Sequence, residues 1–123
     1  MDFMHEHRYN KEQRLQQLSE LRLALRDLIG VVSVRPSFAH LKSAYEAALA
    51  DVENLQLHGF EQEHLSALSR AIPDAFHRHK EWIPPLERDA IGTLIEPEWF
   101  LSLESKLQPV LSKARVLREL GYY

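Results

Sequence analysis

The residues best suited to chemistry are histidines and carboxylates at helical spacing. Glu61 and His64 form the Glu-x-x-His element with which carboxylate-bridged metal proteins line a bundle core. His77 and Glu81 place an imidazole and a carboxylate on one helical face, and such a pair can share a metal ion. These four residues define one hypothesis, a metal-binding helical bundle. The alternative is a solvated helix surface, since Glu61 suits the first turn of a helix and basic residues flank the second pair.

Two arginine-to-histidine spacings suggest a different chemistry. Four residues separate Arg35 from His40, and six separate Arg70 from His77. This spacing resembles the Arg-x4-6-His signature of the HEPN family of helical ribonucleases. The resemblance covers only these residues, and it implies RNA cleavage by such a pair lying beside its symmetry mate. The sequence departs from the family pattern because an apolar residue follows each arginine and each span contains a proline.

Other catalytic signatures are absent from the sequence. It has no cysteine, which excludes thiolate chemistry, and no Gly-x-Ser-x-Gly element. Its four glycines are scattered singly, so no glycine-rich phosphate loop is present. We therefore expect a protein that is not an enzyme and that carries no cofactor.

The charge distribution bears on the class of partner. Fifteen basic residues face eighteen acidic ones, and residues 1–35, 36–72 and 73–123 carry net charges of +1, −3 and −1. Nucleic-acid binding needs a concentrated positive face, which no segment supplies. We expect no nucleic-acid partner.

The sequence also bears on location. The first residues lack the apolar run of a signal peptide, and no stretch approaches the roughly 20 apolar residues of a membrane span. We expect a soluble, cytoplasmic protein of bacterial type with no membrane partner.

The strongest structural pattern lies between Leu15 and Val32. Apolar residues recur there at intervals of three and four, the period of one face of a helix. The stripe is wide enough to contact more than one neighbouring helix. We therefore interpret this segment as the central helix of a bundle, with the stripe Leu18, Leu21, Leu25, Leu28 and Val32.

Helix signals elsewhere complete the predicted fold. A capping box at Asn10 begins the first helix, and a very short linker predicts an antiparallel hairpin with a second helix capped by Ser37. Pro109 should bend or split the last helix. We predict a flexible tail over residues 1–9 and, over 10–123, one all-α domain: a bundle of five or six helices with an N-terminal antiparallel helical hairpin and a kinked C-terminal helix. The expected helices are 11–34, one from Ser37 to His58, 61–71, 74–81, 86–95 and a last one from Pro97 to near Gly121.

The segment from Trp82 to Phe100 contains both tryptophans and three of the six prolines. Aromatic residues on proline-stiffened segments are common at recognition surfaces, although they would equally serve as a lid on the core. Our leading hypothesis is a protein-protein interaction factor, such as an adaptor, inhibitor, immunity-type or regulatory protein, with a homodimer as a further option. Its predicted contact residues are Trp82, Ile83, Leu86, Trp99 and Phe100.

Overall fold

The computed structural model describes residues 6, 7, 9–76, 85–119, 121 and 122. This part of the chain is predominantly helical, so the predicted all-α class is confirmed. Its helices are α1 (Lys11–Val32), the short 3-10 helix η1 (Pro36–Phe38), α2 (Ala39–His58), α3 (Gln62–Ala71) and α4 (Glu98–Val116). Four strands of two residues each form two antiparallel pairs: β1 (Glu6–His7) with β4 (Gly121–Tyr122), and β2 (Glu87–Arg88) with β3 (Leu94–Ile95).

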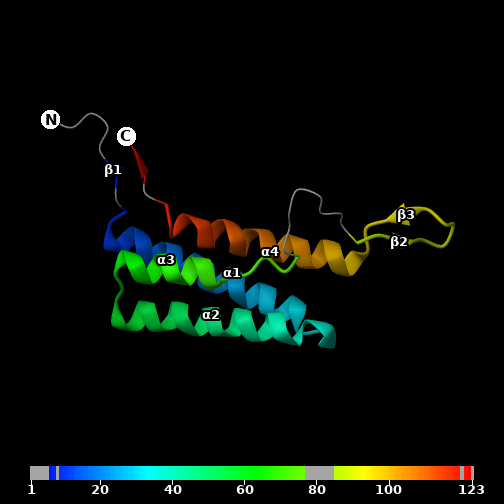
Figure 1. The fold of residues 1–123 in the computed structure, drawn as a ribbon, viewed down its shortest axis with the longest axis horizontal. Helices are drawn as coiled ribbons and strands as arrows, with labels where there is room; N and C mark the ends of the chain where they lie inside the picture. The colour runs from blue at the N-terminus through cyan, green and yellow to red at the C-terminus, as the bar shows by residue number, and fades with distance from the viewer. Residues whose placement is uncertain (1–5, 8, 77–84, 120, 123) are drawn as a thin grey trace.

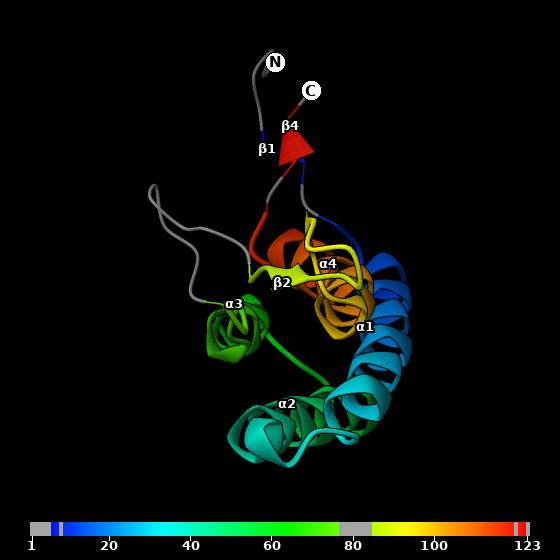
Figure 2. The same cartoon turned by 90° about the vertical axis from the view of Figure 1, so that its right-hand side faces the viewer.

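The four α-helices lie side by side and alternate in direction along the chain (Figure 1). Viewed from the end, α1 and α3 lie across the bundle from each other, with α2 and α4 between them (Figure 2). The two long helices α1 and α4 pack against each other over most of their length. The β2–β3 hairpin projects beyond the end of α4, outside the bundle (Figure 1).

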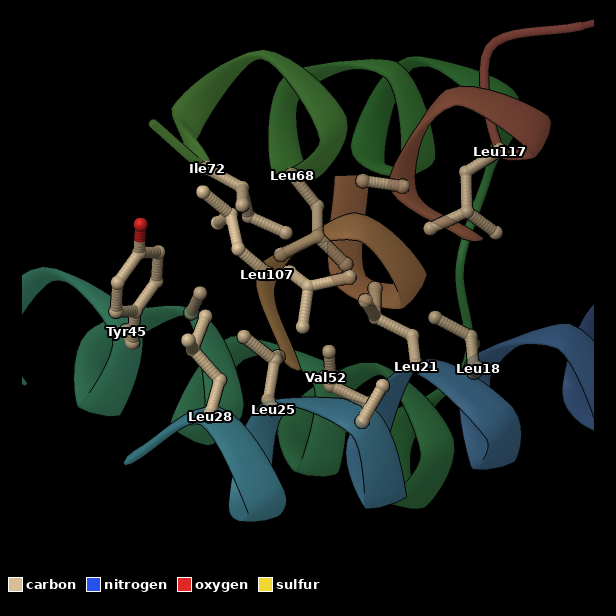
Figure 3. Packing of buried hydrophobic residues seen from close by; sticks show 14 of the residues in the cluster. Leu18, Leu21, Leu25, Leu28, Tyr45, Val52, Leu68, Ile72, Leu107 and Leu117 are labelled. Carbon is tan, nitrogen blue, oxygen red and sulfur yellow. The ribbon is translucent and has the colours of Figure 1, made fainter. Parts of the chain in front are cut away.

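The core is built on the predicted stripe of α1. Leu18, Leu21, Leu25 and Leu28 are fully buried and point toward side chains of the other three helices (Figure 3). Burial of one leucine side chain stabilises a fold by about 1.5–3 kcal/mol, so this stripe is a large part of the driving force for folding. The wide stripe lets α1 pack against both α2 and α4. The expectation of a central helix is wrong, because α1 lies opposite α3 with the other two helices between them (Figure 2).

Local signals at two helix ends act as predicted. The Asn10 side chain accepts from the Gln13 backbone N–H at 2.7 Å, and the Gln13 side chain accepts from the Asn10 backbone N–H at 2.9 Å. Two backbone donors at the start of α1 are thereby satisfied. Gly59 ends α2 with a φ of +93°, a conformation that favours glycine.

The predicted helix count is wrong for the described residues, which contain four α-helices rather than five or six. The expected helix over 86–95 is instead the β2–β3 hairpin, because Gly92 adopts a φ of +87° and breaks any helical pattern there. Of the predicted helix over 74–81, the described part is a turn at 75–76, and residues 77–81 lie outside the described residues. The linker between α1 and α2 also differs in detail, since η1 occupies Pro36–Phe38 and α2 begins only at Ala39.

The last helix, α4, runs without interruption through Pro109. Pro109 is exposed, so the ring lies on the solvent side while Leu107 and Val110 remain buried. The alternative in which this proline splits the helix is therefore wrong.

The chain ends meet through the β1–β4 pair, which joins Glu6 to Tyr122 and His7 to Gly121. Only β1 of this pair lies within residues 1–9, the segment predicted to be a flexible tail. Among the helices of the described residues, none is both long enough and apolar enough to cross a membrane.

Replacing Gly30 by alanine should raise the free energy of unfolding by about 0.5–1 kcal/mol, because alanine loses less conformational entropy in a helix. A Cβ at this exposed position of α1 would meet no atom within 4 Å. Urea denaturation would measure the gain. Gly59→Ala is the matched control and should be destabilising, since its φ is +93° although the space around it is equally open. Equal shifts for both variants would contradict this reasoning.

Candidate protein-binding surface

The β2–β3 hairpin is held together by its turn. The Asp89 backbone N–H donates to the Thr93 carbonyl at 2.9 Å, and the Asp89 carboxylate accepts from the N–H groups of Ile91 at 3.0 Å and Thr93 at 2.9 Å. The Arg88 guanidinium donates to the Gly92 carbonyl at 2.8 Å. Aspartate and glycine thus close a tight turn between strands too short to form much of a ladder.

Four large apolar side chains of this hairpin are exposed. The register pairs Glu87 with Ile95 and Arg88 with Leu94, so each strand pair mixes one charged and one apolar residue. Ile91 at the turn is 87% exposed, the highest value among the large apolar residues of the described chain. We call the following set the hairpin surface: Leu86, Ile91, Leu94 and Ile95.

Trp99 connects the hairpin to the bundle. Its indole Nε1–H donates to the Glu87 carboxylate at 3.2 Å, so the first turn of α4 is tied to β2. The Arg35 guanidinium carbon lies 4.6 Å from the centroid of the Trp99 ring, and the Phe38 ring centroid lies 6.0 Å from it. A cation over an indole face contributes about 0.5–1 kcal/mol at such partly exposed sites. Trp99 therefore connects the base of β2 to the end of the bundle where α1 turns into α2, while the hairpin itself projects beyond α4 (Figure 1).

The segment that carries the hairpin surface is acidic. Residues 85–101 contain four carboxylates and a single basic residue, Arg88, giving this segment a net charge of −3. The carboxylates belong to Glu87, Asp89, Glu96 and Glu98. Exposed apolar side chains with a charged rim are typical of protein interfaces.

The predicted contact residues have different environments. Leu86 is 48% exposed and belongs to the hairpin surface, whereas Trp99 is half-buried in its ring contacts. Phe100 is buried, and its ring centroid lies 5.0 Å from that of Phe76, so it belongs to the packed interior of this chain. Trp82 and Ile83 lie outside the described residues.

Of the four residues in the metal hypothesis, the structure describes two, Glu61 and His64. Glu61 and His64 flank the first turn of α3, where the His64 Nδ1 accepts from the Glu61 backbone N–H at 2.8 Å. Both side chains are exposed. Within the described residues, no group of three or more potential ligands could hold a metal ion. His77 and Glu81 lie outside the described residues.

Only one of the two arginine-histidine pairs, Arg35 and His40, lies wholly within the described residues. Arg35 covers Trp99, while His40 lies exposed in the first turn of α2. Arg70 donates to the Ser66 carbonyl of its own helix at 3.3 Å. His77, the partner of Arg70 in this reading, lies outside the described residues.

The sequence analysis missed a buried cation, Arg14. Its side chain lies at the start of α1 and is 3% exposed. Nη1 donates to the Gln17 side chain and to the Val116 carbonyl, both at 2.9 Å, and Nη2 donates to the Gln62 side chain at 2.9 Å and to the Glu119 carbonyl at 3.1 Å. Burial lowers the pKa of this guanidinium. Because both terminal nitrogens are occupied by protein oxygens, we assign Arg14 a structural role at the end of α4.

The hairpin surface was likewise missed in part, since Ile91, Leu94 and Ile95 were not among the predicted contacts. A signal for it was present: Asp89 and Gly92 are turn formers, and the residues Thr93, Leu94 and Ile95 that follow favour a strand. The helical interpretation of 86–95 placed these side chains on a helix and concealed their exposure.

Comparison with known proteins gave no match, whether with protein-family models, with curated proteins or with solved structures. The function is therefore inferred from the surface of this chain alone.

Proposed function

We propose that this protein acts by binding another protein through its hairpin surface. The observation that supports this most directly is a concentration of exposed apolar side chains. Eight large apolar residues are exposed in the described chain, and four of them lie within the ten residues 86–95. Scattered exposed leucines are ordinary, but several exposed apolar residues on one short segment favour an interaction site.

The position of the hairpin supports the same proposal. The hairpin projects beyond the end of α4, away from the other helices of the bundle (Figure 1). Burying each of these partly exposed side chains would contribute on the order of 1–2 kcal/mol, which suits binding anchors. The hydrogen bond from Trp99 to Glu87 ties the base of the hairpin to α4, which reduces the conformational freedom lost on binding.

The proposed class is a small adaptor, inhibitor, immunity-type or regulatory factor. Its work needs only a rigid bundle that presents one recognition element. We place this interaction in the cytoplasm, because a chain without cysteine suits a reducing compartment.

Leu94→Ser should remove most of the complex formed with the partner, because it replaces an apolar contact by a hydroxyl on an exposed strand. The 14.4 kDa chain would be purified under mild conditions from its native host and weighed by native mass spectrometry. We expect the wild type to carry a second protein and Leu94→Ser to reduce that complex at least fivefold.

Leu57→Ser is the matched control, since Leu57 is 78% exposed at the far end of α2, away from the hairpin. It should retain the complex. Loss of the partner in both variants, or a bare chain in the wild type, would contradict the proposal.

A further inference from the structure

Ile91 has an exposed side chain without a structural role in the described chain. The turn uses the backbone N–H of Ile91, which donates to Asp89, and leaves its side chain 87% exposed. Any residue type with the same backbone conformation could make that bond. A β-branched apolar residue at the tip of a polar turn is therefore unexplained by the stability of the hairpin.

The turn presents this side chain in a fixed place. Hydrogen bonds to the Asp89 carboxylate, across the turn to Thr93 and from Arg88 to Gly92 restrain the turn on both sides of it. A loop restrained before binding loses little conformational entropy when it docks. Such a tip can act as an anchor for a pocket without first having to order itself.

The charges around the tip define the chemistry of the complementary surface. Residues 85–101 carry a net charge of −3, and the one basic side chain, Arg88, is turned back onto the Gly92 carbonyl. A symmetric contact with a second copy would bring two such acidic segments together, which is repulsive. An anionic membrane surface would repel the tip for the same reason.

We propose that the turn 89–93 is a preformed anchor that inserts Ile91 into an apolar pocket of a partner protein, with lysine or arginine side chains around the rim of that pocket. This inference rests on the proposed function and specifies its partner. The apolar tip supplies the anchor, and the surrounding carboxylates select a basic rim and accelerate encounter.

The test begins with the full chain carrying the photoreactive amino acid p-benzoylphenylalanine in place of Ile91, and in a second sample in place of Leu57. Each is expressed in the native host and irradiated, and the adducts are identified by mass spectrometry. The protein captured from position 91 is then purified and titrated with wild type and variants. The readouts are the Kd and the association rate at low and high salt.

Ile91→Ser should weaken binding of the purified partner at least about tenfold, the effect of losing a buried anchor. Ala90→Ser, a neighbouring exposed position in the same turn, should stay within about twofold of wild type. The double variant Glu96→Gln and Glu98→Gln should slow association several-fold at low salt and have little effect at high salt. Unchanged circular dichroism of all variants would show that each one folds.

Other outcomes separate this inference from the proposed function. A partner captured from position 57 and not 91, or equal affinities of wild type and Ile91→Ser, would overturn the anchor and leave protein binding intact. Crosslinks between two copies of the chain at position 91 would also overturn the anchor. So would binding to a membrane through Ile91, seen as sedimentation of the wild type, but not of Ile91→Ser, with vesicles of phosphatidylcholine and phosphatidylglycerol. Capture of no protein at either position would overturn both.

Discussion

Arg14→Met is expected to lower the free energy of unfolding by about 2–4 kcal/mol, because it removes a buried group that makes four hydrogen bonds. Urea denaturation followed by circular dichroism would measure the loss. Methionine keeps much of the apolar stem, so the change reports mainly on the guanidinium.

The physical reason lies at the carboxyl end of α4. Carbonyl groups in the last turn of a helix have no partner within the helix and carry the negative end of its dipole. Arg14 satisfies the carbonyls of Val116 and Glu119, and the Gln62 amide donates to the carbonyl of Leu117 at 2.8 Å. Residues from α1 and α3 together therefore close the end of α4. Removing Arg14 takes one donor from each of these two carbonyls and from the Gln17 and Gln62 side chains, although the Val116 carbonyl still accepts from the Glu119 N–H at 3.1 Å.

Two other variants make the experiment specific. Arg14→Lys keeps the charge but cannot direct donors to four acceptors, so it should lose stability as well, though less than methionine. Arg26→Met removes an arginine whose side chain is 49% exposed and whose Nη2 lies 3.7 Å from Glu53, and it should cost less than about 1 kcal/mol. Equal decreases in the free energy of unfolding for Arg14→Met and Arg26→Met would show that the buried hydrogen bonds of Arg14 stabilise the fold no more than an exposed ion pair does.

The helices could be predicted from the sequence because their signals are local. The stripe of α1 repeats over about four turns, and the capping box at Asn10 and the glycine at position 59 act within four residues of a helix end. Each signal retains its meaning whatever the rest of the chain does. The class of fold follows from such signals directly.

The hairpin could not be predicted as easily because two interpretations competed over ten residues. Leu86, Ile91, Leu94 and Ile95 suit either a short helix or a strand pair, and periodicity does not separate the two over so short a segment. The turn formed by Asp89 and Gly92 decides between them. Once the segment is a hairpin, its apolar residues cannot all face the bundle.

Arg14 and Tyr45 depend on contacts between distant parts of the chain. Arg14 meets residues more than one hundred positions away, and Tyr45 of α2 donates its hydroxyl proton to the Pro73 carbonyl after α3. No short pattern in the sequence indicates such a partner. A lone arginine beside an apolar stripe is far more often a solvated residue than a buried one.

Tyr45→Phe is expected to reverse the order of stability between neutral and alkaline pH. Tyr45 is fully buried, and its hydroxyl donates to the Pro73 carbonyl at 2.9 Å. Losing that hydrogen bond should make the variant less stable than wild type by about 1 kcal/mol at pH 7. The hydroxyl points away from the leucines of α1 (Figure 3), so the phenyl ring can fill the same space.

Burial raises the pKa of Tyr45 above its ordinary value, and the carboxylate of Asp74 raises it further. The folded chain therefore keeps its proton at a pH where the unfolded chain releases it. A raised pKa in the folded state gives stability that is complete below the ordinary pKa of about 10 and declines as the pH rises toward the folded value. Wild type should lose about 1.4 kcal/mol per pH unit in that window from this group alone.

The comparison with Tyr45→Phe isolates this contribution, because every other titrating group is shared. The stability advantage of wild type should shrink above pH 10 and change sign near pH 11, as measured by urea denaturation at pH 7, 9, 10, 11 and 11.5. Asp74→Asn should lower the pKa of Tyr45, while burial still holds that pKa above its ordinary value. The pH range over which wild type loses stability should then end at a lower pH. Parallel stability curves for wild type and Tyr45→Phe from pH 9 to 11.5 would mean that the phenol is accessible to ionisation in the folded chain, and the buried contact between α2 and the end of α3 would have to be reconsidered.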